Sequence, residues 1–323
     1  MTPIMSVLMP VFNDAEYVQD AVESILDQSF TDFELVVVND GSTDETPDIL
    51  KSAAGRDERI RLYHQENRGI SSARNRLIEE ARGQFLVNMD GDDVSASERL
   101  ESQIQYLHQH PDVDVVGTQM AYIGPTGRPT GRPATTTPTD AASIAWQLLF
   151  GMCVFHPTWC ARREALQSEI YSSNYNVAED YELISRLSRR HIIANLDLPL
   201  YKVRESPSRI SNERSQEQAS IARSVMHREH QSLLGYKYNH ALSEALSQGR
   251  EIDTAGVRYA IWLATRLADR NGYGVRQRAI ILRRLYDRIA CASNTTILHK
   301  AAVLLLGSTH QSLYSLRASF PVW

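Results

Sequence analysis

The sequence of 323 residues has few cysteines and no long apolar run. Its three cysteines, Cys153, Cys160 and Cys291, are too few and too scattered for a disulfide framework or a zinc site. No segment reaches the roughly 20 apolar residues that span a bilayer. The first residues lack a basic stretch followed by an apolar one, so we expect no secretory signal. These absences predict a globular protein of the reducing cytoplasm.

Two common nucleotide-binding motifs are also missing. The first predicted strand, residues 4–12, runs into Asn13 and Asp14 without a glycine, whereas a nicotinamide oxidoreductase needs a glycine-rich turn there. The Gly-x4-Gly-Lys-Ser/Thr motif of P-loop nucleotide hydrolases does not occur. A sugar-nucleotide pyrophosphorylase is expected to have a glycine-rich, basic first loop, and this loop is acidic. The sequence therefore argues against all three classes.

Charge is unevenly distributed along the chain. The whole sequence has 34 Lys and Arg against 39 Asp and Glu, a net charge of −5. Residues 1–204 hold 18 basic and 30 acidic residues (−12), and residues 205–323 hold 16 and 9 (+7), which sum to −5. The basic part suits contact with an anionic surface, such as a phospholipid headgroup or a diphosphate-linked acceptor. A solvated basic helix face explains the same composition.

Strands and helices alternate through the first ninety or so residues. Short apolar runs predict buried strands, and apolar residues at helical spacing predict helices between them. The predicted strands are residues 4–12, 33–38, 60–64 and 85–89, and the predicted helices include 17–26 and 70–81. Ser42 or Thr43 is predicted to cap a further helix after the second strand. The alternation predicts an α/β fold with a parallel sheet and helices on both faces.

The pattern changes after residue 95. A strand is predicted at residues 113–123, an irregular connection at 127–139 and a helix at 140–150. Another helix begins near Glu179, and the chain reads as almost entirely helical from about residue 213. We therefore expect a C-terminal helical region after the α/β part.

Three of the predicted parallel strands end in or beside polar residues. Asn13 and Asp14 follow the first strand, Asp40 the second and Asp90 the fourth. In open α/β sheets ligands bind beyond the carboxyl ends of the strands. These residues are therefore expected to converge on one site.

Residues 90–93, Asp-Gly-Asp-Asp, place three carboxylates directly after an apolar strand. Like charges so close repel each other and favour a bound cation. Ligands that are all oxygen favour Mg²⁺ or Mn²⁺, which keep coordination positions for phosphate oxygens. An Asp-rich turn that caps the next helix is the alternative, and the position after a strand favours the metal site.

Three further carboxylates allow a structural and a functional interpretation. Asp40 could accept a hydrogen bond from the imide N–H of a pyrimidine base, or form a turn before Gly41. Glu179 and Asp180 precede a predicted helix, where one could act as a general base. Acidic residues there also stabilise the positive end of the helix dipole. Taken singly, each carboxylate favours its structural role.

The motifs occur together in an order that resembles a known family. They are Pro10-Val11-Phe12-Asn13, then Asn39 to Asp44, then Asn67-Arg68-Gly69 with Ala73-Arg74-Asn75, then residues 89–93, and finally Glu179-Asp180. As a set they resemble the inverting glycosyltransferases of family 2, which have the GT-A fold. The resemblance covers residues 4–211, including Tyr201 to Arg204 and Arg209 to Ser211. Each motif alone is weak.

The resemblance implies a donor-binding set. Asp40 would recognise the base, framed by the backbone of Pro10, Val11 and Phe12 and by the Arg68 side chain, with Asn13 beside them. Phe12 stands where many relatives have tyrosine, so it loses a hydroxyl and keeps the stacking surface. Asp92 would be the principal ligand of Mn²⁺ or Mg²⁺, and Asp90 would lie near the ribose and the metal.

The resemblance also implies the catalytic groups. Asp180 would be the general base, and Glu179 is the second candidate. His156 would lie near the acceptor or the metal, or else be a partly buried structural histidine. Residues 1–211 would form the transferase domain, with residues 1–95 binding the nucleotide and 96–211 the acceptor.

The implied activity is inverting transfer of a hexose or N-acetylhexosamine from a nucleotide-sugar to a hydroxyl of a glycan or lipid-linked acceptor. Asp40 favours UDP- or dTDP-sugars, and surface polysaccharide synthesis is the expected setting. The alternative is a non-catalytic subunit that binds a nucleotide-sugar within an assembly complex. No nucleic acid partner is expected. Residues 212–323 would contact the inner face of an anionic membrane or another subunit.

Overall fold

The computed structural model describes residues 2–292 except 176, 206–213, 249 and 251–252. The chain divides into two compact units. The first unit consists of residues 1–139 and 153–222, and the second of residues 140–152 and 223–323. The boundary expected between residues 211 and 212 lies outside the described residues. Residues 140–152, which the sequence places in the acceptor-binding half, group with the C-terminal helices.

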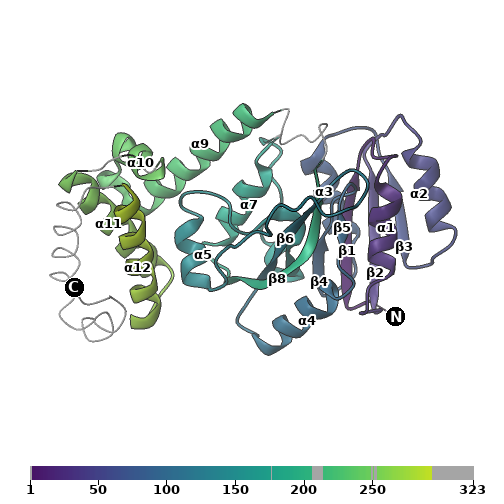
Figure 1. Cartoon of the computed structure of the whole chain (residues 1–323), viewed down its shortest axis with the longest axis horizontal. Coiled ribbons are helices and arrows are strands. Elements are labelled where there is room, and N and C mark those ends of the chain that lie inside the picture. The colour runs from purple at the N-terminus through teal and green to yellow at the C-terminus, as the bar shows by residue number, and fades with distance from the viewer. Residues whose placement is uncertain (1, 176, 206–213, 249, 251–252, 293–323) are drawn as a thin grey trace. The chain divides into compact units, whose positions relative to one another are not determined.

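The first unit is built on one sheet of the order β3-β2-β1-β4-β7-β6-β8-β5 among the described residues (Figure 1). The strands are β1 Met5–Val11, β2 Phe33–Asn39, β3 Ile60–His64, β4 Phe85–Asn88, β5 Val94–Ser95, β6 Val115–Ile123, β7 Cys160–Arg162 and β8 Ile193–Arg204. The first four strands pair in parallel, as the sequence predicts. The α/β fold class is confirmed.

The remaining strands make the sheet mixed rather than parallel throughout. β7 runs antiparallel to β4 and β6, β5 runs antiparallel to β8, and β6 pairs in parallel with β8. The parallel arrangement predicted from the first ninety or so residues therefore does not continue beyond β4. The sequence pattern did not indicate three of these strands. β5 and β7 have only two and three residues, too few to show a periodic pattern. In β8 the middle residues are exposed, which interrupts the alternation of buried and exposed side chains.

Helices cover both faces of the parallel strands. They are α1 Val18–Leu26, α2 Thr46–Ala54 and α3 Ile70–Glu80. The helices that follow in the first unit are α4 Arg99–Gln109, α6 Arg163–Gln167 and α7 Glu179–Leu187. Right-handed crossovers in the order β3-β2-β1-β4 place α1 and α2 on one face and α3 on the other (Figure 1). Every residue of β1 and β2 is buried, as expected for strands covered on both sides.

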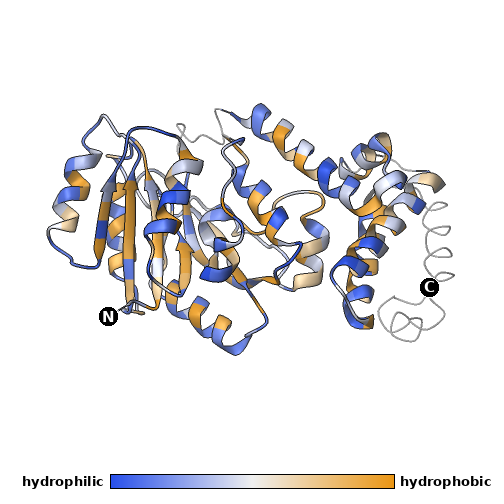
Figure 2. Ribbon diagram, turned by 180° about the vertical axis from the view of Figure 1, so that it is seen from behind, coloured by the Kyte–Doolittle hydropathy of each residue, from blue (hydrophilic) through white to orange (hydrophobic). Residues whose placement is uncertain are grey.

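The hydropathy of the elements matches this layering. Apolar residues dominate the strands at the centre of the first unit, and the helices have one apolar and one polar side (Figure 2). In α1 the buried residues are Val18, Ala21, Val22 and Ile25, which repeat at helical spacing. The core therefore holds the strands rigidly, and their carboxyl ends present the loops that carry the acidic residues.

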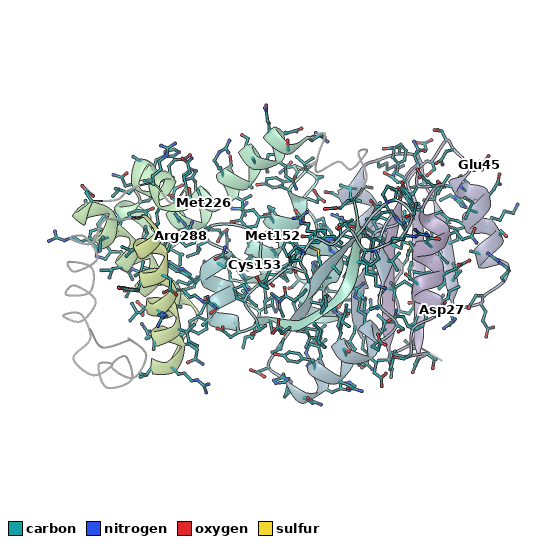
Figure 3. All side chains as sticks on the ribbon, in the orientation of Figure 1. Asp27, Glu45, Met152, Cys153, Met226 and Arg288 are labelled. Carbon is teal, nitrogen blue, oxygen red and sulfur yellow. The ribbon has the colours of Figure 1, made fainter. Side chains whose placement is uncertain are left out.

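The cap predicted for α2 is wrong. The helix begins at Thr46, and its N-cap residue is Glu45 (Figure 3), whose side chain makes no capping hydrogen bond. Ser42 instead accepts a hydrogen bond on its Oγ from the Asn13 N–H at 2.9 Å, and the Thr43 N–H donates to Asn13 Oδ1 at 2.9 Å. These residues join the loops after β1 and β2.

The described part of the second unit is helical, as the sequence predicts for its C-terminal portion. Its helices are α5 Ala141–Gln147, most of α9 Ser215–Leu234, α10 His240–Ser247, α11 Thr254–Arg270 and α12 Val275–Ala292. They share an apolar core that includes Trp146, Leu263 and Leu285. Among the described helices, none combines the length and the apolar composition needed to cross a membrane.

Candidate functional site

The loops after β1 and β2 lie against each other at the carboxyl edge of the sheet. The Asp40 N–H donates to the Val11 carbonyl at 2.9 Å, in addition to the bonds that join Asn13 to Ser42 and Thr43. Asn13 has a positive φ of 52°, a conformation that asparagine tolerates better than most residues. The first loop therefore turns sharply and brings the Phe12 backbone next to the second loop.

Asp40 is buried and holds the loop that precedes α3. Its Oδ1 accepts hydrogen bonds from Gln65 Nε2 at 2.7 Å and from the Arg68 N–H at 3.0 Å, and its Oδ2 accepts one from the Gly69 N–H at 2.9 Å. Gly41 follows with a φ of 77°, and a Cβ there would lie 2.6 Å from the Asn67 backbone nitrogen. Asp40 and Gly41 together allow the loops to approach.

The predicted donor-binding residues differ in exposure. Pro10 and Val11 are buried in β1, whereas the Phe12 side chain is 46% exposed. The Arg68 side chain is also exposed. An exposed phenyl ring beside a buried carboxylate can offer a stacking surface to a planar ring.

The carboxylates of Asp90, Asp92 and Asp93 form a cluster at the end of β4. They offer ligand oxygens that all lie within 4.8 Å of one another. Asp93 is completely buried, and its Oδ1 accepts a hydrogen bond from the Arg204 N–H at 2.8 Å. The Arg204 Nε in turn donates to the Asp92 carbonyl at 2.9 Å. Asp93 therefore fastens the cluster to β8, and Asp90 and Asp92 are the more accessible carboxylates.

Asp14, which the sequence places after the first strand without assigning it a specific role, extends this cluster. Burial and then the negative charge of Asp92 raise the pKa of Asp14 to about 7, although the Phe12 N–H lowers it. A Cβ on Gly91 would lie 3.0 Å from Asp14 Oδ2, so the first loop and the acidic cluster are in close contact. The position of Asp14 after the first predicted strand was the only indication in the sequence that it belongs to the site. Its burial could not be predicted from the sequence.

Arg74 connects the acidic cluster to the start of α7. Its guanidinium is paired with Glu179 and lies 3.6 Å from Asp90 Oδ1. The charges of Glu179 and Asp90 raise the pKa of Arg74 above its usual value despite burial. One buried cation thus brings together carboxylates that are widely separated in sequence.

Asp180 is the neighbour of Glu179 but has a different environment. Its Oδ1 accepts a hydrogen bond from the Tyr181 N–H at 2.7 Å. Burial and the charge of Glu179 raise the pKa of Asp180 to about 6, against the opposing effect of Arg74. A carboxylate with a raised pKa can accept a proton more readily than an ordinary aspartate. Glu179, by contrast, is held in an ion pair.

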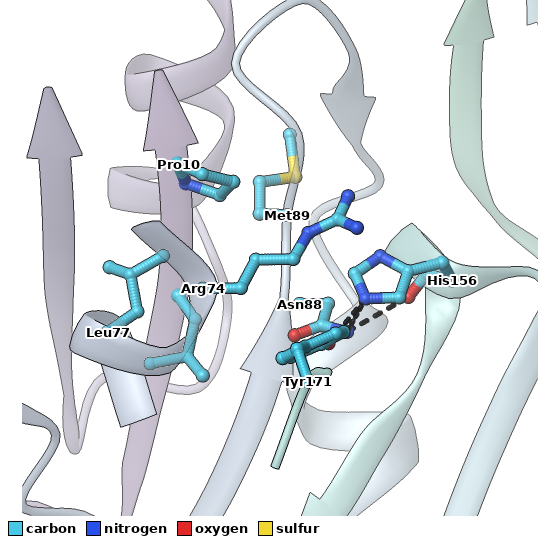
Figure 4. A pocket seen from close by; sticks show the side chains of 8 residues that line it. Pro10, Arg74, Leu77, Asn88, Met89, His156 and Tyr171 are labelled. Carbon is cyan, nitrogen blue, oxygen red and sulfur yellow. Dashed lines mark hydrogen bonds between the residues drawn. The ribbon is translucent and has the colours of Figure 1, made fainter. Parts of the chain in front are cut away.

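His156 lies in a buried pocket beside Arg74 (Figure 4). Its Nε2 is 3.0 Å from Asn88 Nδ2 and 2.5 Å from the Tyr171 hydroxyl. Burial and the charge of Arg74 lower the pKa of His156 well below its usual value, so the ring is neutral. Its Nδ1 is buried and has no hydrogen-bond partner among the described residues. No motif in the sequence indicated that Tyr171 would contact His156.

The first unit therefore places the predicted residues at one edge of the sheet. Asp14, Asp90 and Asp92 interact electrostatically, Arg74 joins Asp90 to Glu179, and Asp90 raises the pKa of Asp180. The arrangement offers carboxylate ligands, a buried cation and a carboxylate of raised pKa. These are the groups needed to bind a cation and to accept a proton.

Comparison with known proteins identifies relatives of this chain. EpsJ of Bacillus subtilis, an uncharacterized glycosyltransferase, is 29% identical over 222 residues, which are 65% of this chain and 64% of EpsJ. TuaG of the same organism, named as a teichuronic acid biosynthesis glycosyltransferase, is 41% identical over 106 residues, 32% of this chain and 42% of TuaG. The matched region therefore spans less than two thirds of either relative.

Solved structures show the same fold. TarS of Staphylococcus aureus, residues 1–349 in complex with UDP, aligns with a TM-score of 0.57 and 18% identity over 88% of this chain and 87% of that chain. A mannosyltransferase of Pyrobaculum calidifontis in complex with GDP-Man and Mn²⁺ aligns with a TM-score of 0.53 and 14% identity, over 98% of this chain and 84% of that chain. These alignments confirm the GT-A fold.

The family is decided by a match to the sequence itself. The family model described as glycosyl transferase family 2 matches residues 6–168, which contain the loops after β1, β2 and β4. The matched part is more than half of the 323 residues. The family predicted from the motifs is confirmed: this chain belongs to glycosyl transferase family 2.

Proposed function

We propose that this chain transfers a hexose or N-acetylhexosamine from a UDP- or dTDP-sugar to an acceptor hydroxyl, with inversion at the anomeric carbon. The observation that carries the proposal is the position of Arg74, which is paired with Glu179 and lies 3.6 Å from Asp90. A donor diphosphate bound near Asp90 would thereby lie close to Asp180, a carboxylate suited to accept a proton.

Base recognition is assigned to the loops after β1 and β2. Phe12 offers an exposed ring, with the backbone of Pro10, Val11 and Asn13 and the exposed Arg68 around it. Asp40 already accepts three hydrogen bonds, and a carboxylate has about four acceptor positions. One position therefore stays available for the imide N–H of uracil or thymine. TarS, a structural neighbour, has been solved with UDP.

The acidic cluster fits a hard divalent cation. Its ligand atoms are all carboxylate oxygens and lie within 4.8 Å of one another, a set that favours Mg²⁺ or Mn²⁺. Because Asp93 is bonded to the Arg204 backbone, we assign Asp92 as the principal ligand and Asp90 as its partner. A divalent cation bound there would offset the charge that develops on the departing nucleoside diphosphate.

Proton transfer is assigned to Asp180. The acceptor oxygen would form a bond to the anomeric carbon as the bond between that carbon and the diphosphate oxygen breaks. The hydroxyl proton would pass to the Asp180 carboxylate. Glu179 is the weaker candidate because its carboxylate is paired with Arg74, which fixes its direction. A single displacement of this kind inverts the carbon.

The acceptor is proposed to be a glycan or a lipid-linked oligosaccharide of surface polysaccharide synthesis. TuaG, a relative over part of the chain, carries teichuronic acid biosynthesis in its name. The basic residues after residue 204 would contact the anionic headgroups of a membrane, which keeps the enzyme near such an acceptor. We propose residues 1–95 as the donor-binding part, 96–211 as the acceptor-binding part with His156 beside the reacting groups, and 212–323 as the surface for membrane or subunit contact.

Thermal unfolding with a panel of nucleotide-sugars tests the donor. Each donor is added with Mn²⁺ and with EDTA, because a ligand raises the melting temperature only if it binds the folded state. We expect a UDP- or dTDP-sugar to stabilise the protein only with the metal, and release of the nucleoside diphosphate when an acceptor mixture is added. Stabilisation by GDP-sugars alone would overturn the pyrimidine assignment. Donor binding without any release would support the non-catalytic subunit.

A further inference from the structure

Two histidines and a glutamate lie together on α9 and α10, in the second unit. His240 and Glu244 are four residues apart on α10 and therefore share one face of that helix. His227 of α9 faces them, with its ring stacked on that of His240 at 4.2 Å between centroids. The ligand atoms of the three residues all lie within 4.8 Å of one another.

A chain of hydrogen bonds leads from the Leu149 carbonyl through His230 and Ser243 to His227. The carbonyl oxygen of Leu149 can only accept, so His230 Nε2, at 2.9 Å, must carry the proton that is donated to it. Burial lowers the pKa of His230 to about 3, which keeps the ring neutral and leaves a lone pair on Nδ1. That lone pair accepts the hydroxyl proton of Ser243, whose Oγ lies 2.7 Å away.

Two hydroxyls face Nδ1 of His227. The Ser243 Oγ lies 3.1 Å away and, with its own proton donated to His230, can accept the Nδ1 proton. The Tyr238 hydroxyl lies 3.0 Å from the same nitrogen. In the tautomer that carries its proton on Nδ1, His227 presents the lone pair of Nε2 on its other side.

That lone pair points at an acceptor. His227 Nε2 lies 3.0 Å from Glu244 Oε2, and in this tautomer both atoms offer electron pairs. Such a contact is favourable only with a cation between or beside the two atoms, either a proton or a metal ion. His240 stands at the same place with a second imidazole.

We propose that His227, His240 and Glu244 form a zinc site that joins α9 to α10. Two imidazole nitrogens and one carboxylate oxygen are a common set for Zn²⁺, with a water in the fourth position. The bond from His227 Nδ1 to Ser243 is the outer contact that orients a metal-binding histidine. Mg²⁺ and Mn²⁺ prefer oxygen ligands, so this site differs in selectivity from the acidic cluster in the first unit.

Metal binding to the full chain, without an affinity tag, tests the proposal. The protein is stripped with EDTA, dialysed and titrated with Zn²⁺ by calorimetry at neutral pH. We expect one zinc ion per chain to bind in the wild type and in the Asp92→Asn variant, with a rise in melting temperature. In His240→Ala and Glu244→Gln, Zn²⁺ affinity should fall by more than about tenfold, and His108→Ala, at an exposed histidine of α4, should behave as wild type.

Two further measurements do not depend on loss of a ligand. Co²⁺ in place of Zn²⁺ should give the visible absorption of a four-coordinate nitrogen and oxygen site in the unaltered protein. Ser243→Ala keeps all three ligands and should weaken Zn²⁺ binding by about 10- to 100-fold, because the Nδ1 proton loses an acceptor. The proposal is overturned if His240→Ala binds Zn²⁺ like the wild type, or if the wild type binds none. In either case a shared proton, and not a metal, would join His227 to Glu244.

Discussion

Arg74 on α3 and Glu179 at the start of α7 form a buried ion pair across 105 residues of sequence. The same guanidinium approaches Asp90, so it lies between the acidic cluster and the proposed base. A buried ion pair is expensive to form, and removing one member leaves a charge without its partner. The pair therefore orders the site, and its loss has a measurable cost.

Glu179→Gln is expected to lower the free energy of unfolding by about 3 kcal/mol, because Arg74 keeps a buried charge. Urea denaturation measures the change. Glu16→Gln is the control, since Glu16 is exposed and should alter stability by less than about 0.5 kcal/mol. If Glu179→Gln were as stable as the wild type and lost all transfer, Glu179 would be the base instead of Asp180.

Asp180→Asn is expected to lower kcat by about 10²- to 10⁴-fold while the donor binds with nearly unchanged affinity. The carboxylate that accepts the proton is lost, and the residues that bind the nucleotide remain. Transfer assays and donor calorimetry on the same preparation separate the two effects. Asp197→Asn, at an exposed position of β8, serves as the control. Retained transfer in Asp180→Asn would refute its assignment as the base.

The rate of transfer should rise with pH through about 6, where Asp180 loses its proton. The effect of pH on stability has the opposite sign to its effect on the rate. The folded-state pKa of Asp180 lies above the value of about 3.9 in an unfolded chain, so between pH about 4 and 6 the folded state binds more protons. The contribution of Asp180 to the free energy of unfolding therefore falls as pH rises across this window. A rate profile that stays flat from pH 5 to 8 contradicts the assignment.

Asp92 and Asp93 should respond differently to removal of their charge. Asp92→Asn is expected to abolish the Mn²⁺-dependent part of donor binding with little change in stability, because its carboxylate is the proposed metal ligand. Asp93→Asn should lower the free energy of unfolding by about 1–3 kcal/mol, because its buried carboxylate holds the Arg204 N–H. The melting temperatures of both variants, measured with and without Mn²⁺ in the presence of the donor, show which carboxylate binds the metal. Equal loss of metal dependence would show that Asp93 is also a ligand.

Gly41→Ala should destabilise the protein by about 1–3 kcal/mol and weaken donor binding. Its φ of 77° disfavours any side chain, and the new Cβ would lie 2.6 Å from the Asn67 backbone nitrogen. Gly55→Ala is the matched control. Gly55 has a φ of −73°, and its Cβ would meet nothing closer than 3.5 Å, so the free energy of unfolding should stay equal or rise slightly. Equal effects at both glycines would contradict the role given to the Gly41 loop.

Much of the secondary structure of residues 1–95, the proposed donor-binding part, could be predicted from local sequence pattern. The bounds of β3 were predicted to the residue, and β1, β2 and β4 to within one residue at each end. Their apolar runs are long and uninterrupted because both faces of these strands are buried. The N-terminal cap of α2 was not predicted correctly, because Ser42 bonds to the neighbouring loop instead of capping the helix.

The sequence by itself determined the parallel strands, the family and the placement of Asp40, Asp90 and Asp92 at strand ends, since these depend on periodicity and on residues close in sequence. Tertiary structure alone decided that Asp93 is fastened to Arg204 across 111 residues, that Arg74 joins Glu179 to Asp90, and that Asp180 has a raised pKa. The physical reason is the same for each. Burial and the contacts of distant residues set these energies, and neighbouring residues in the chain do not reveal them. Even at Asp180, the charge of the adjacent Glu179 acts together with burial and the charge of Arg74, which only the fold supplies.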